Sequence, residues 1–293
     1  MRVFSSFHPA ALFTYYIAVL LTSMFTRNPV IIALSLLGSF FFFASMSRPK
    51  EILKSAGFYL VLFLLMTLAN PLFSHDGETI LFLVNDNPFT LEALLYGALV
   101  ASMLIAVLFW CKCYYLIMTS DKFIYLFGKA APKLSLVLSM ALRFIPDMKA
   151  QSKRIRAAQK TLGLYLSKKL VDRLLSELRV FSALLSWSLE NAVETSDSMR
   201  ARGYGLKNRS HFSLFTFRLK DGVLIILTLL VFAATLIGMQ AGLFTYEFYP
   251  ALTPVAANTG AVVLYSCLAI FMLAPFLLEL EEHLHWNYLK SKV

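Results

Sequence analysis

The chain contains six apolar runs, each close to the length that a helix needs to cross a lipid bilayer. We place these runs at Ala10–Phe25, Pro29–Met46, Phe58–Phe73, Leu91–Cys111, Gly222–Phe244 and Val255–Leu278. About 20 helical residues span a hydrocarbon core ~30 Å thick. Only 15% of the 293 residues are charged and 58% are hydrophobic, which excludes an ordinary soluble globular protein. The sequence therefore predicts an all-α, polytopic membrane protein with about six transmembrane helices.

The basic residues are concentrated in one segment, which predicts the orientation in the membrane. Arg143–Lys220 contains 16 Lys/Arg and 6 Asp/Glu, a surplus of 10 positive charges. The loops Ser74–Thr90 and Thr245–Pro254 contain acidic residues but no lysine or arginine. Because basic residues near span ends favour the cytoplasmic side, we expect the basic segment and both termini in the cytoplasm and these two loops outside. Arg27, in the outer turn between the first two runs, is a mild exception.

The same segment divides the chain into three expected parts. Residues 1–118 contain transmembrane helices 1–4, residues 119–220 form a cytoplasmic helical region, and residues 221–293 contain the last two transmembrane helices and a cytoplasmic tail. About one hundred residues are far more than a connection between two spans requires, and long ordered insertions usually have a function.

The first part of the insertion predicts an amphipathic helix with two stripes. Apolar residues recur every seven positions, at Leu134, Ala141, Met148, Ile155 and Leu162. Cationic residues lie beside them, at Lys149, Lys153, Arg156 and Lys160. Pro146 has no backbone N–H, so it should kink or break this helix near Arg143.

The second part predicts a longer helix that ends in the stretch SMRARGYG. Its apolar stripe consists of Val171, Leu174, Leu178, Phe181, Leu185, Leu189, Ala192, Ser196 and Met199. The expected length is about 32 residues, or ~48 Å at 1.5 Å per residue. Gly203 follows the last turn, where glycine readily adopts the left-handed cap conformation. Arg200 and Arg202 then lie in the final turn.

Arginines at this helix end have two interpretations. Cations near a helix C-terminus are favoured by about 0.3–1 kcal/mol, and basic residues near the surface also bind anionic lipid, so they could be membrane anchors. Alternatively, the exposed end could dock into another protein.

The order of elements, together with two short motifs, favours docking. Arg143-Phe144-Ile145-Pro146 lies in the first inserted helix, and Ala201-Arg202-Gly203-Tyr204 ends the second. With four spans before the insertion and two after it, the chain resembles the transmembrane T component (EcfT/CbiQ-like) of energy-coupling factor (ECF) type ABC transporters. The resemblance covers most of the chain in architecture and is residue-specific between about Pro132 and Gly205.

This resemblance implies a non-catalytic subunit in a bacterial or archaeal-type cell membrane. A T component links two cytoplasmic ABC-type ATPase subunits to a small membrane S component, which captures a vitamin or other micronutrient. It implies no cofactor, no metal and no nucleic acid. The implied ATPase-docking residues are Arg200, Ala201, Arg202, Gly203 and Tyr204 at one helix end, and Lys160, Leu162 and Gly163 at the other. In the family pattern, each of the two inserted helices ends near a small residue, an arginine and a glycine. In the first helix of this chain, Leu162 occupies the position of that arginine.

Two other classes of function remain as alternatives. A secondary carrier or channel with a basic, membrane-surface regulatory insert should show charged or interrupted positions at mid-membrane. The spans offer Asn70-Pro71, which we expect at an outer helix end, Glu92 near a span end, and Pro275. We expect the segment Gly238–Gly242 to permit close helix packing.

A membrane-embedded enzyme is the second alternative, and it needs clustered reactive groups. The three cysteines, Cys111, Cys113 and Cys267, have no zinc-type spacing with histidine, and the chain has no phosphate-binding glycine loop. His8, His75 and His211 are scattered. His283 and His285 lie beside Glu279, Glu281 and Glu282, which we interpret as a solvated helix end rather than a metal site.

Overall fold

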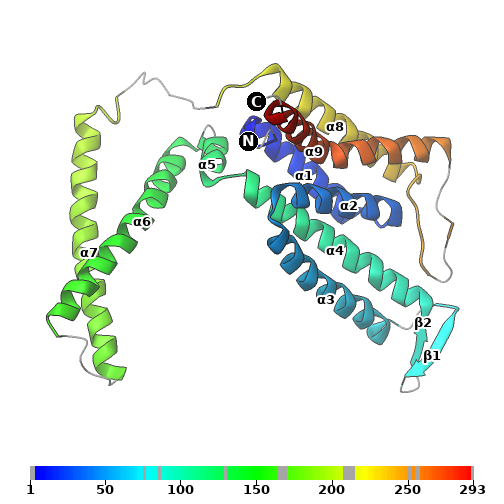
Figure 1. Cartoon of the computed structure of the whole chain (residues 1–293), viewed down its shortest axis with the longest axis horizontal. Helices are drawn as coiled ribbons and strands as arrows, with labels where there is room; N and C mark the ends of the chain where they lie inside the picture. Colours follow the sequence, from blue (N-terminus) through cyan, green and yellow to red (C-terminus); the bar gives the residue numbers. More distant parts are fainter. Residues whose placement is uncertain are drawn as a thin grey trace. The chain divides into compact units, whose positions relative to one another are not determined.

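A computed structural model describes residues 4–74, 77–84, 87–128, 131–163, 170–206, 215–249, 253–254 and 258–291. A short 3-10 turn, η1 (Phe4–Ser6), precedes the first helix. The α-helices in these ranges are α1 (Pro9–Phe25), α2 (Pro29–Met46), α3 (Pro49–Phe73), α4 (Leu91–Ile117), α5 (Ser120–Gly128), α6 (Pro132–Thr161), α7 (Leu170–Ala201), α8 (Leu219–Gln240) and α9 (Thr259–Ser291) (Figure 1).

Five of these helices, α2, α3, α4, α8 and α9, are long and apolar enough to cross a membrane. The helix at the first predicted run, α1, is apolar but has 17 residues. The predicted start of the third run at Phe58 was wrong, because α3 begins at Pro49. Proline suits the first helical position, since its fixed φ is helical and its missing N–H would have no partner there. The chain is a polytopic, helical membrane protein.

The chain divides into two compact units. The first, which we call the membrane unit, consists of Met1–Lys122 and Phe215–Val293. The second, the inserted unit, consists of Phe123–Leu214 and contains α6 and α7.

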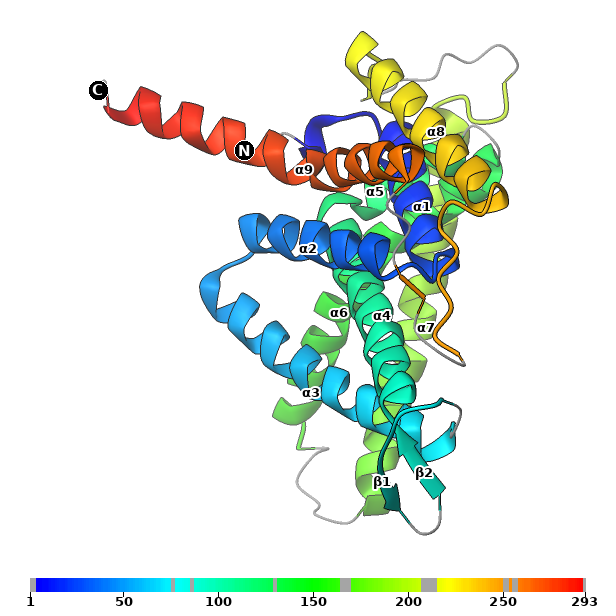
Figure 2. The same cartoon turned by 90° about the vertical axis from the view of Figure 1, so that its right-hand side faces the viewer.

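Helix α4 lies at the centre of the first half of the membrane unit. It packs against both α2 and α3, which have little contact with each other, and α2 also packs against α9 (Figure 2). Gly97 allows the close approach of α3 to α4, because a Cβ atom at this position would lie 2.9 Å from the Thr67 carbonyl oxygen.

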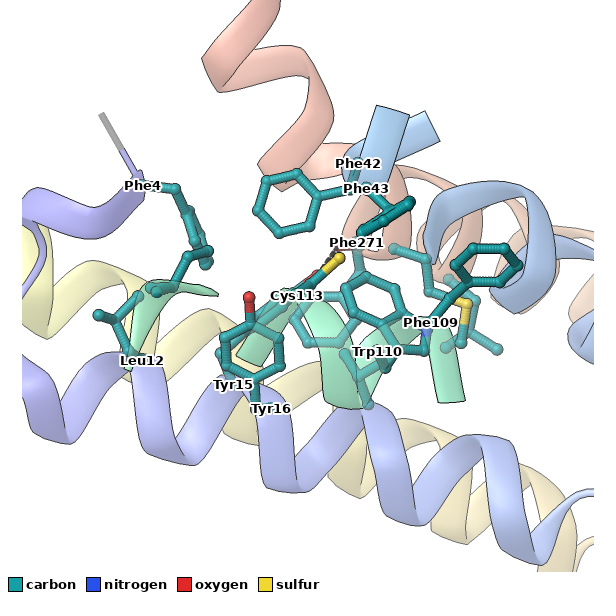
Figure 3. Packing of buried hydrophobic residues seen from close by; sticks show 14 of the residues in the cluster. Phe4, Leu12, Tyr15, Tyr16, Phe42, Phe43, Phe109, Trp110, Cys113 and Phe271 are labelled. Atoms are coloured by element: carbon teal, nitrogen blue, oxygen red, sulfur yellow. Dashed lines mark hydrogen bonds between the residues drawn. The ribbon is translucent and has the colours of Figure 1, made fainter. Parts of the chain in front are cut away.

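An aromatic cluster forms the core of the membrane unit (Figure 3). Trp110 and Tyr15 are fully buried in it. Their polar atoms are satisfied, because the Trp110 indole N–H donates to Ser35 Oγ at 3.0 Å and the Tyr15 hydroxyl donates to the Phe271 carbonyl at 3.1 Å. Buried aromatic side chains with paired polar atoms define a specific core rather than a lipid-facing surface.

The structure contains one element type that the sequence did not predict. Strands β1 (Ile80–Val84) and β2 (Asn87–Thr90) form an antiparallel ribbon between α3 and α4 (Figure 2). Glu92, in the first turn of α4, accepts hydrogen bonds from the Thr79 hydroxyl at 2.7 Å and from its backbone N–H at 3.3 Å. This carboxylate therefore ties the start of the ribbon to α4.

Candidate functional site

Helices α6 and α7 form an antiparallel pair. Near the middle of α6, the Phe144 ring stacks on Trp187 of α7 with centroids 5.5 Å apart and planes within 6°. Nearer the end of α6, Arg156 Nη2 lies 2.7 Å from Glu177 Oε2, in the first part of α7. Later residues of α6 thus meet earlier residues of α7, so the two C-terminal ends lie at opposite ends of the pair (Figure 1).

Pro146 lies inside α6, which continues through it from Pro132 to Thr161. The break that we considered for this proline does not occur. Arg143 is exposed on the same helix. The part played by Phe144 in the Arg-Phe-Ile-Pro motif is clear, since its ring makes the stacking contact with Trp187. Sequence analysis did not single out Trp187, because its partner is 43 positions away and no local pattern marks it.

The predicted apolar stripe of α7 does not face α6. The most buried residues of α7 are Ser176 and Val180, 1% and 2% exposed, and they share a face with Trp187. At 3.6 residues per turn, the apolar stripe lies roughly 160° around the helix from this face. Its six leading members are between 46% and 69% exposed: Val171, Leu174, Leu178, Phe181, Leu185 and Leu189. Within the inserted unit, α6 therefore leaves a long apolar surface of α7 uncovered.

In α6, unlike α7, part of the apolar stripe lies on the side that faces the other helix, and the cationic stripe is mostly exposed. Met148 and Ile155, from the apolar stripe, are half-buried on the side of α6 that carries Phe144. The cationic residues Lys149, Lys153 and Lys160 are exposed. Arg156 belongs to the cationic stripe and forms the ion pair with Glu177. The remaining cations give α6 a positive, solvent-facing surface that leads toward its C-terminal end.

Helix α7 ends in a Schellman cap. The Tyr204 N–H donates to the Met199 carbonyl at 2.9 Å, and the Gly203 N–H donates to the Arg200 carbonyl at 2.9 Å. Gly203 has a φ of 77°, in the left-handed region that favours glycine. The prediction of a left-handed glycine cap is confirmed. Arg202 is the last residue before this glycine, and it is exposed.

The end of α6 has the same local geometry. The Gly163 N–H donates to the Lys160 carbonyl at 3.1 Å, and Gly163 has a φ of 76°. Leu162 is therefore placed as Arg202 is, directly before the left-handed glycine, and Lys160 is placed as Arg200 is. Leu162 is 75% exposed. The two helix ends share a left-handed glycine whose N–H donates to the carbonyl three residues earlier, and they differ in whether a leucine or an arginine occupies the position before this glycine.

These ends suit contact with another protein by different chemistries. Arg200 and Arg202 are exposed beside each other at the end of α7, and a guanidinium can donate several directed hydrogen bonds to carboxylates or carbonyls while remaining charged. The end of α6 offers an exposed leucine and one exposed ammonium group at Lys160. His75 and His211, which we noted in the sequence, lie outside the described residues, as do the basic residues Lys207 and Arg209.

The membrane unit offers little for ion conduction in its described parts. Glu92 is 3% exposed and its carboxylate is engaged by Thr79, which gives it a structural role. A groove of about 540 Å³ opens between α2, α3, α4 and the segment after α8. The residues that line it, among them Ile32, Leu36 and Leu99, include no charged side chain. Asn70 and Pro71 lie in the last turn of α3, where we expected a helix end.

The helix-packing role expected for the segment Gly238–Gly242 is confirmed at Gly238. A Cβ atom there would lie 3.0 Å from Leu264 Cδ1 of α9 and 2.7 Å from the ring of Phe244. His283 and His285 are exposed within α9. Across the described ranges, no group of three or more His, Cys, Asp or Glu side chains could hold a metal ion.

Comparison with known proteins connects these features to a family. The sequence pattern of CbiQ, described as "Cobalt transport protein", matches residues 6–213, more than half of the chain. The chain is also 35% identical over 96 residues to the energy-coupling factor transporter transmembrane protein EcfT of Listeria innocua, covering 32% of this chain and 36% of that protein. It is 32% identical over 107 residues to EcfT of Streptococcus equi, covering 36% and 40%.

A third relative, EcfT of Bacillus selenitireducens, is 34% identical over 106 residues, 36% of this chain and 40% of that protein. The matched stretches thus span 36% to 40% of these relatives. The family match, by contrast, runs from residue 6 through α7, and it includes the C-terminal ends of both α6 and α7. On that match the chain belongs to the CbiQ family.

Proposed function

We propose that this chain is the transmembrane coupling (T) subunit of an ECF-type ABC transporter. It links two cytoplasmic ATPase subunits to a small membrane S component that binds a vitamin or other micronutrient. The observation that carries the proposal is the pair of capped, exposed helix ends at opposite ends of α6 and α7. Membership of the CbiQ family and the relatives named EcfT support it.

Two opposed helix ends suit two ATPase subunits. Each end would enter a groove on one ATPase, with Arg202 and Arg200 donating hydrogen bonds at one contact. Leu162 would pack at the other, with Lys160 beside it. The antiparallel contact between Phe144 and Trp187 makes α6 and α7 move together, because packed elements shift as units. A movement of the ATPases on binding or hydrolysing ATP would then rotate or tilt the whole pair.

The uncovered apolar stripe of α7 supplies the surface for the third partner. Its leading residues are about half exposed or more, and a soluble surface of this kind usually marks an interface. We assign this stripe to the S component, whose own surface is apolar because it lies in the membrane. The basic inserted unit then lies on the cytoplasmic side, as the distribution of lysine and arginine favours.

Arg202→Glu tests the docking assignment. Removing one side of a buried charged contact and adding the opposite charge should weaken ATPase association by about 2–5 kcal/mol. The measurement is the amount of ATPase that copurifies with the full complex in mild detergent, compared with the amount of inserted chain in the membrane.

Arg179→Glu is the matched control, because Arg179 is an exposed arginine of α7 far from its C-terminal end and the change in charge is the same. We expect it to retain the ATPases. Equal recovery of ATPase with both variants would contradict docking at Arg202. Recovery of the unaltered chain without any ATPase would contradict the coupling function itself.

A further inference from the structure

Besides Glu92, three charged groups of the membrane unit are buried in the described ranges. They are Lys122, Asp221 and Glu279, which are 9%, 3% and 5% exposed. Burying a charge is costly unless the group is hydrogen-bonded or paired, so such groups are informative wherever they occur. All three form hydrogen bonds with one short segment, Phe4–His8: Lys122 donates, and the two carboxylates accept.

The contacts are made to the backbone of this segment. Lys122 Nζ donates to the Ser5 carbonyl at 2.6 Å, and it also donates to the Ile117 carbonyl at the end of α4 at 3.2 Å. The His8 N–H donates to Asp221 Oδ1 at 2.7 Å. The Phe4 N–H donates to Glu279 Oε1 at 3.2 Å. Burial lowers the pKa of Lys122, and the two carbonyls compensate in part for its loss of water.

The side chains at the two ends of this segment, Phe4 and His8, also bind it to the membrane unit. Phe4 is 1% exposed, and its ring meets Tyr15 and Phe42 edge-on at 5.4 Å and 5.6 Å, so it belongs to the aromatic core (Figure 3). His8 caps α1, because its Nδ1 accepts from the Ala10 N–H at 3.2 Å. Its ring also meets Phe217 edge-on at 5.3 Å. The segment is therefore fixed to the core of the membrane unit.

Two of these contacts lie where the chain leaves and re-enters the membrane unit. Lys122 is the last residue before the inserted unit, and the chain returns at Phe215. Asp221 follows six residues later, and its Oδ2 accepts from the Arg218 N–H at 2.8 Å, which holds the first turn of α8. The exit and the re-entry of the inserted unit are thus both bonded to Phe4–His8.

We propose that Phe4–His8, Lys122 and Asp221 form a clamp that holds both roots of the inserted unit, meaning the points where the chain leaves the membrane unit at Lys122 and re-enters it before Asp221. This inference rests on the proposed coupling function and adds positioning residues to it. Helices α6 and α7 can move the membrane helices only if the two roots are held in place. Otherwise the residues that connect the units absorb the displacement. The clamp passes the movement of α6 and α7 to the membrane helices. Without it, ATP hydrolysis continues but moves less substrate.

The test uses the full transporter complex reconstituted in liposomes, with ATP hydrolysis and substrate uptake measured on the same preparation. Lys122→Met and Asp221→Ala should retain the bound ATPases and their ATP hydrolysis. Uptake per ATP hydrolysed should fall about fivefold or more, as expected from losing hydrogen bonds to charged groups. Lys122→Arg, which can still donate to both carbonyls, should recover much of the ratio.

Lys112→Met is the matched control. Lys112 is also a partly buried lysine of the membrane unit, where its Nζ donates to Ser55 Oγ at 2.8 Å, but it lies away from both roots. Its loss should lower thermal stability and leave uptake per ATP unchanged. If Asp221→Ala does not assemble, Asp221→Asn keeps one acceptor oxygen and is measured by the same ratio.

The outcomes separate the two proposals. If the unaltered chain binds ATPases and the Lys122 and Asp221 variants keep the normal ratio, the clamp is wrong and the coupling function stands. The clamp is also wrong if the Lys112 variant lowers the ratio as much as they do. If the unaltered chain binds no ATPase, the coupling function is wrong, and the clamp, which rests on it, is wrong as well.

Discussion

Leu162 and Arg202 occupy the same place at two helix ends and differ in chemistry. Each directly precedes a glycine whose φ lies near 76°, and in both cases that glycine's N–H donates to the carbonyl three residues earlier. The leucine is 75% exposed, so the difference has little effect on the fold of the single chain. It affects what each end can bind, and it predicts unequal contacts with the two ATPase subunits that we propose as partners.

Lys160→Glu should weaken ATPase association less than Arg202→Glu does. An exposed ion pair between Lys160 and a carboxylate of the ATPase would contribute about 0.2–1 kcal/mol to the association. Leu162 would supply apolar contact, which this substitution leaves in place. Copurification of each ATPase, measured separately by mass spectrometry, tests the difference. Lys153→Glu, one heptad earlier on the same cationic stripe, is the control. A loss as large as that of Arg202→Glu would mean that the end of α6 is the stronger contact.

Gly203→Ala should destabilise the cap of α7. A residue with a Cβ atom in the left-handed region costs about 1–2 kcal/mol, and this Cβ would also lie 2.9 Å from Leu206 Cδ1. We expect faster hydrogen exchange in the last turn of α7 and weaker ATPase binding. Gly57→Ala in α3 is the control, because nothing lies within 4 Å of the new Cβ atom. Unchanged exchange at Arg202 and Gly203 would contradict the role given to the cap.

At the scale of elements, two different faces of α7 are suited to contacts with other helices. One face, with Ser176, Val180 and Trp187, pairs with α6, and the other is the uncovered apolar stripe. An amphipathic helix normally buries its apolar stripe within its own domain. Since α7 pairs with α6 through a different face, the stripe remains available to a partner.

Phe181→Asp tests the stripe. Phe181 is 58% exposed, so the chain itself should lose little stability, whereas burying an unpaired carboxylate against the S component should abolish their association. Copurification of the S component and the thermal midpoint of the isolated chain are the two measurements. Ser186→Asp adds the same charge at an exposed position beside the stripe. Loss of the S component with both variants would point to general repulsion instead of a specific contact.

At the scale of the whole molecule, the membrane unit and the inserted unit have separate tasks. The membrane unit has an aromatic core and bonded polar groups, and the inserted unit presents exposed stripes and helix ends. This division fits a coupling subunit. A carrier would instead need a charged group available along a pathway within the spans.

Glu92→Gln distinguishes these two classes of function. In a coupling subunit, the amide still accepts from Thr79, so uptake by the assembled transporter should stay near normal. The thermal midpoint should fall slightly, by the equivalent of ~1 kcal/mol for a weakened hydrogen bond. In a carrier that used this carboxylate, uptake would cease while the protein remained folded. Asp86→Asn, six positions earlier in the sequence, controls for the loss of one negative charge.

Several features followed from the sequence because their causes are local. Hydrophobic runs placed the five helices that are long and apolar enough to cross a membrane and the shorter α1, a repeat of three and four residues predicted α7 at its observed length of 32 residues, and Gly203 marked its cap. Pro146 did not end the helix as considered, because α6 continues through it from Pro132 to Thr161. The resemblance that rested on Arg143–Pro146 and Ala201–Tyr204 led to the family that the comparison supports.

By itself, the sequence determined that this is a multi-span helical protein with a basic, amphipathic insertion, since periodicity and charge act within a few turns of one helix. Only the tertiary structure decided which face of α7 meets α6. It also decided that Glu92 holds a β-ribbon, and that Lys122, Asp221 and Glu279 converge on Phe4–His8. Glu279 and Phe4 are 275 positions apart, and contacts between such distant residues depend on how the whole chain packs, which no local pattern specifies.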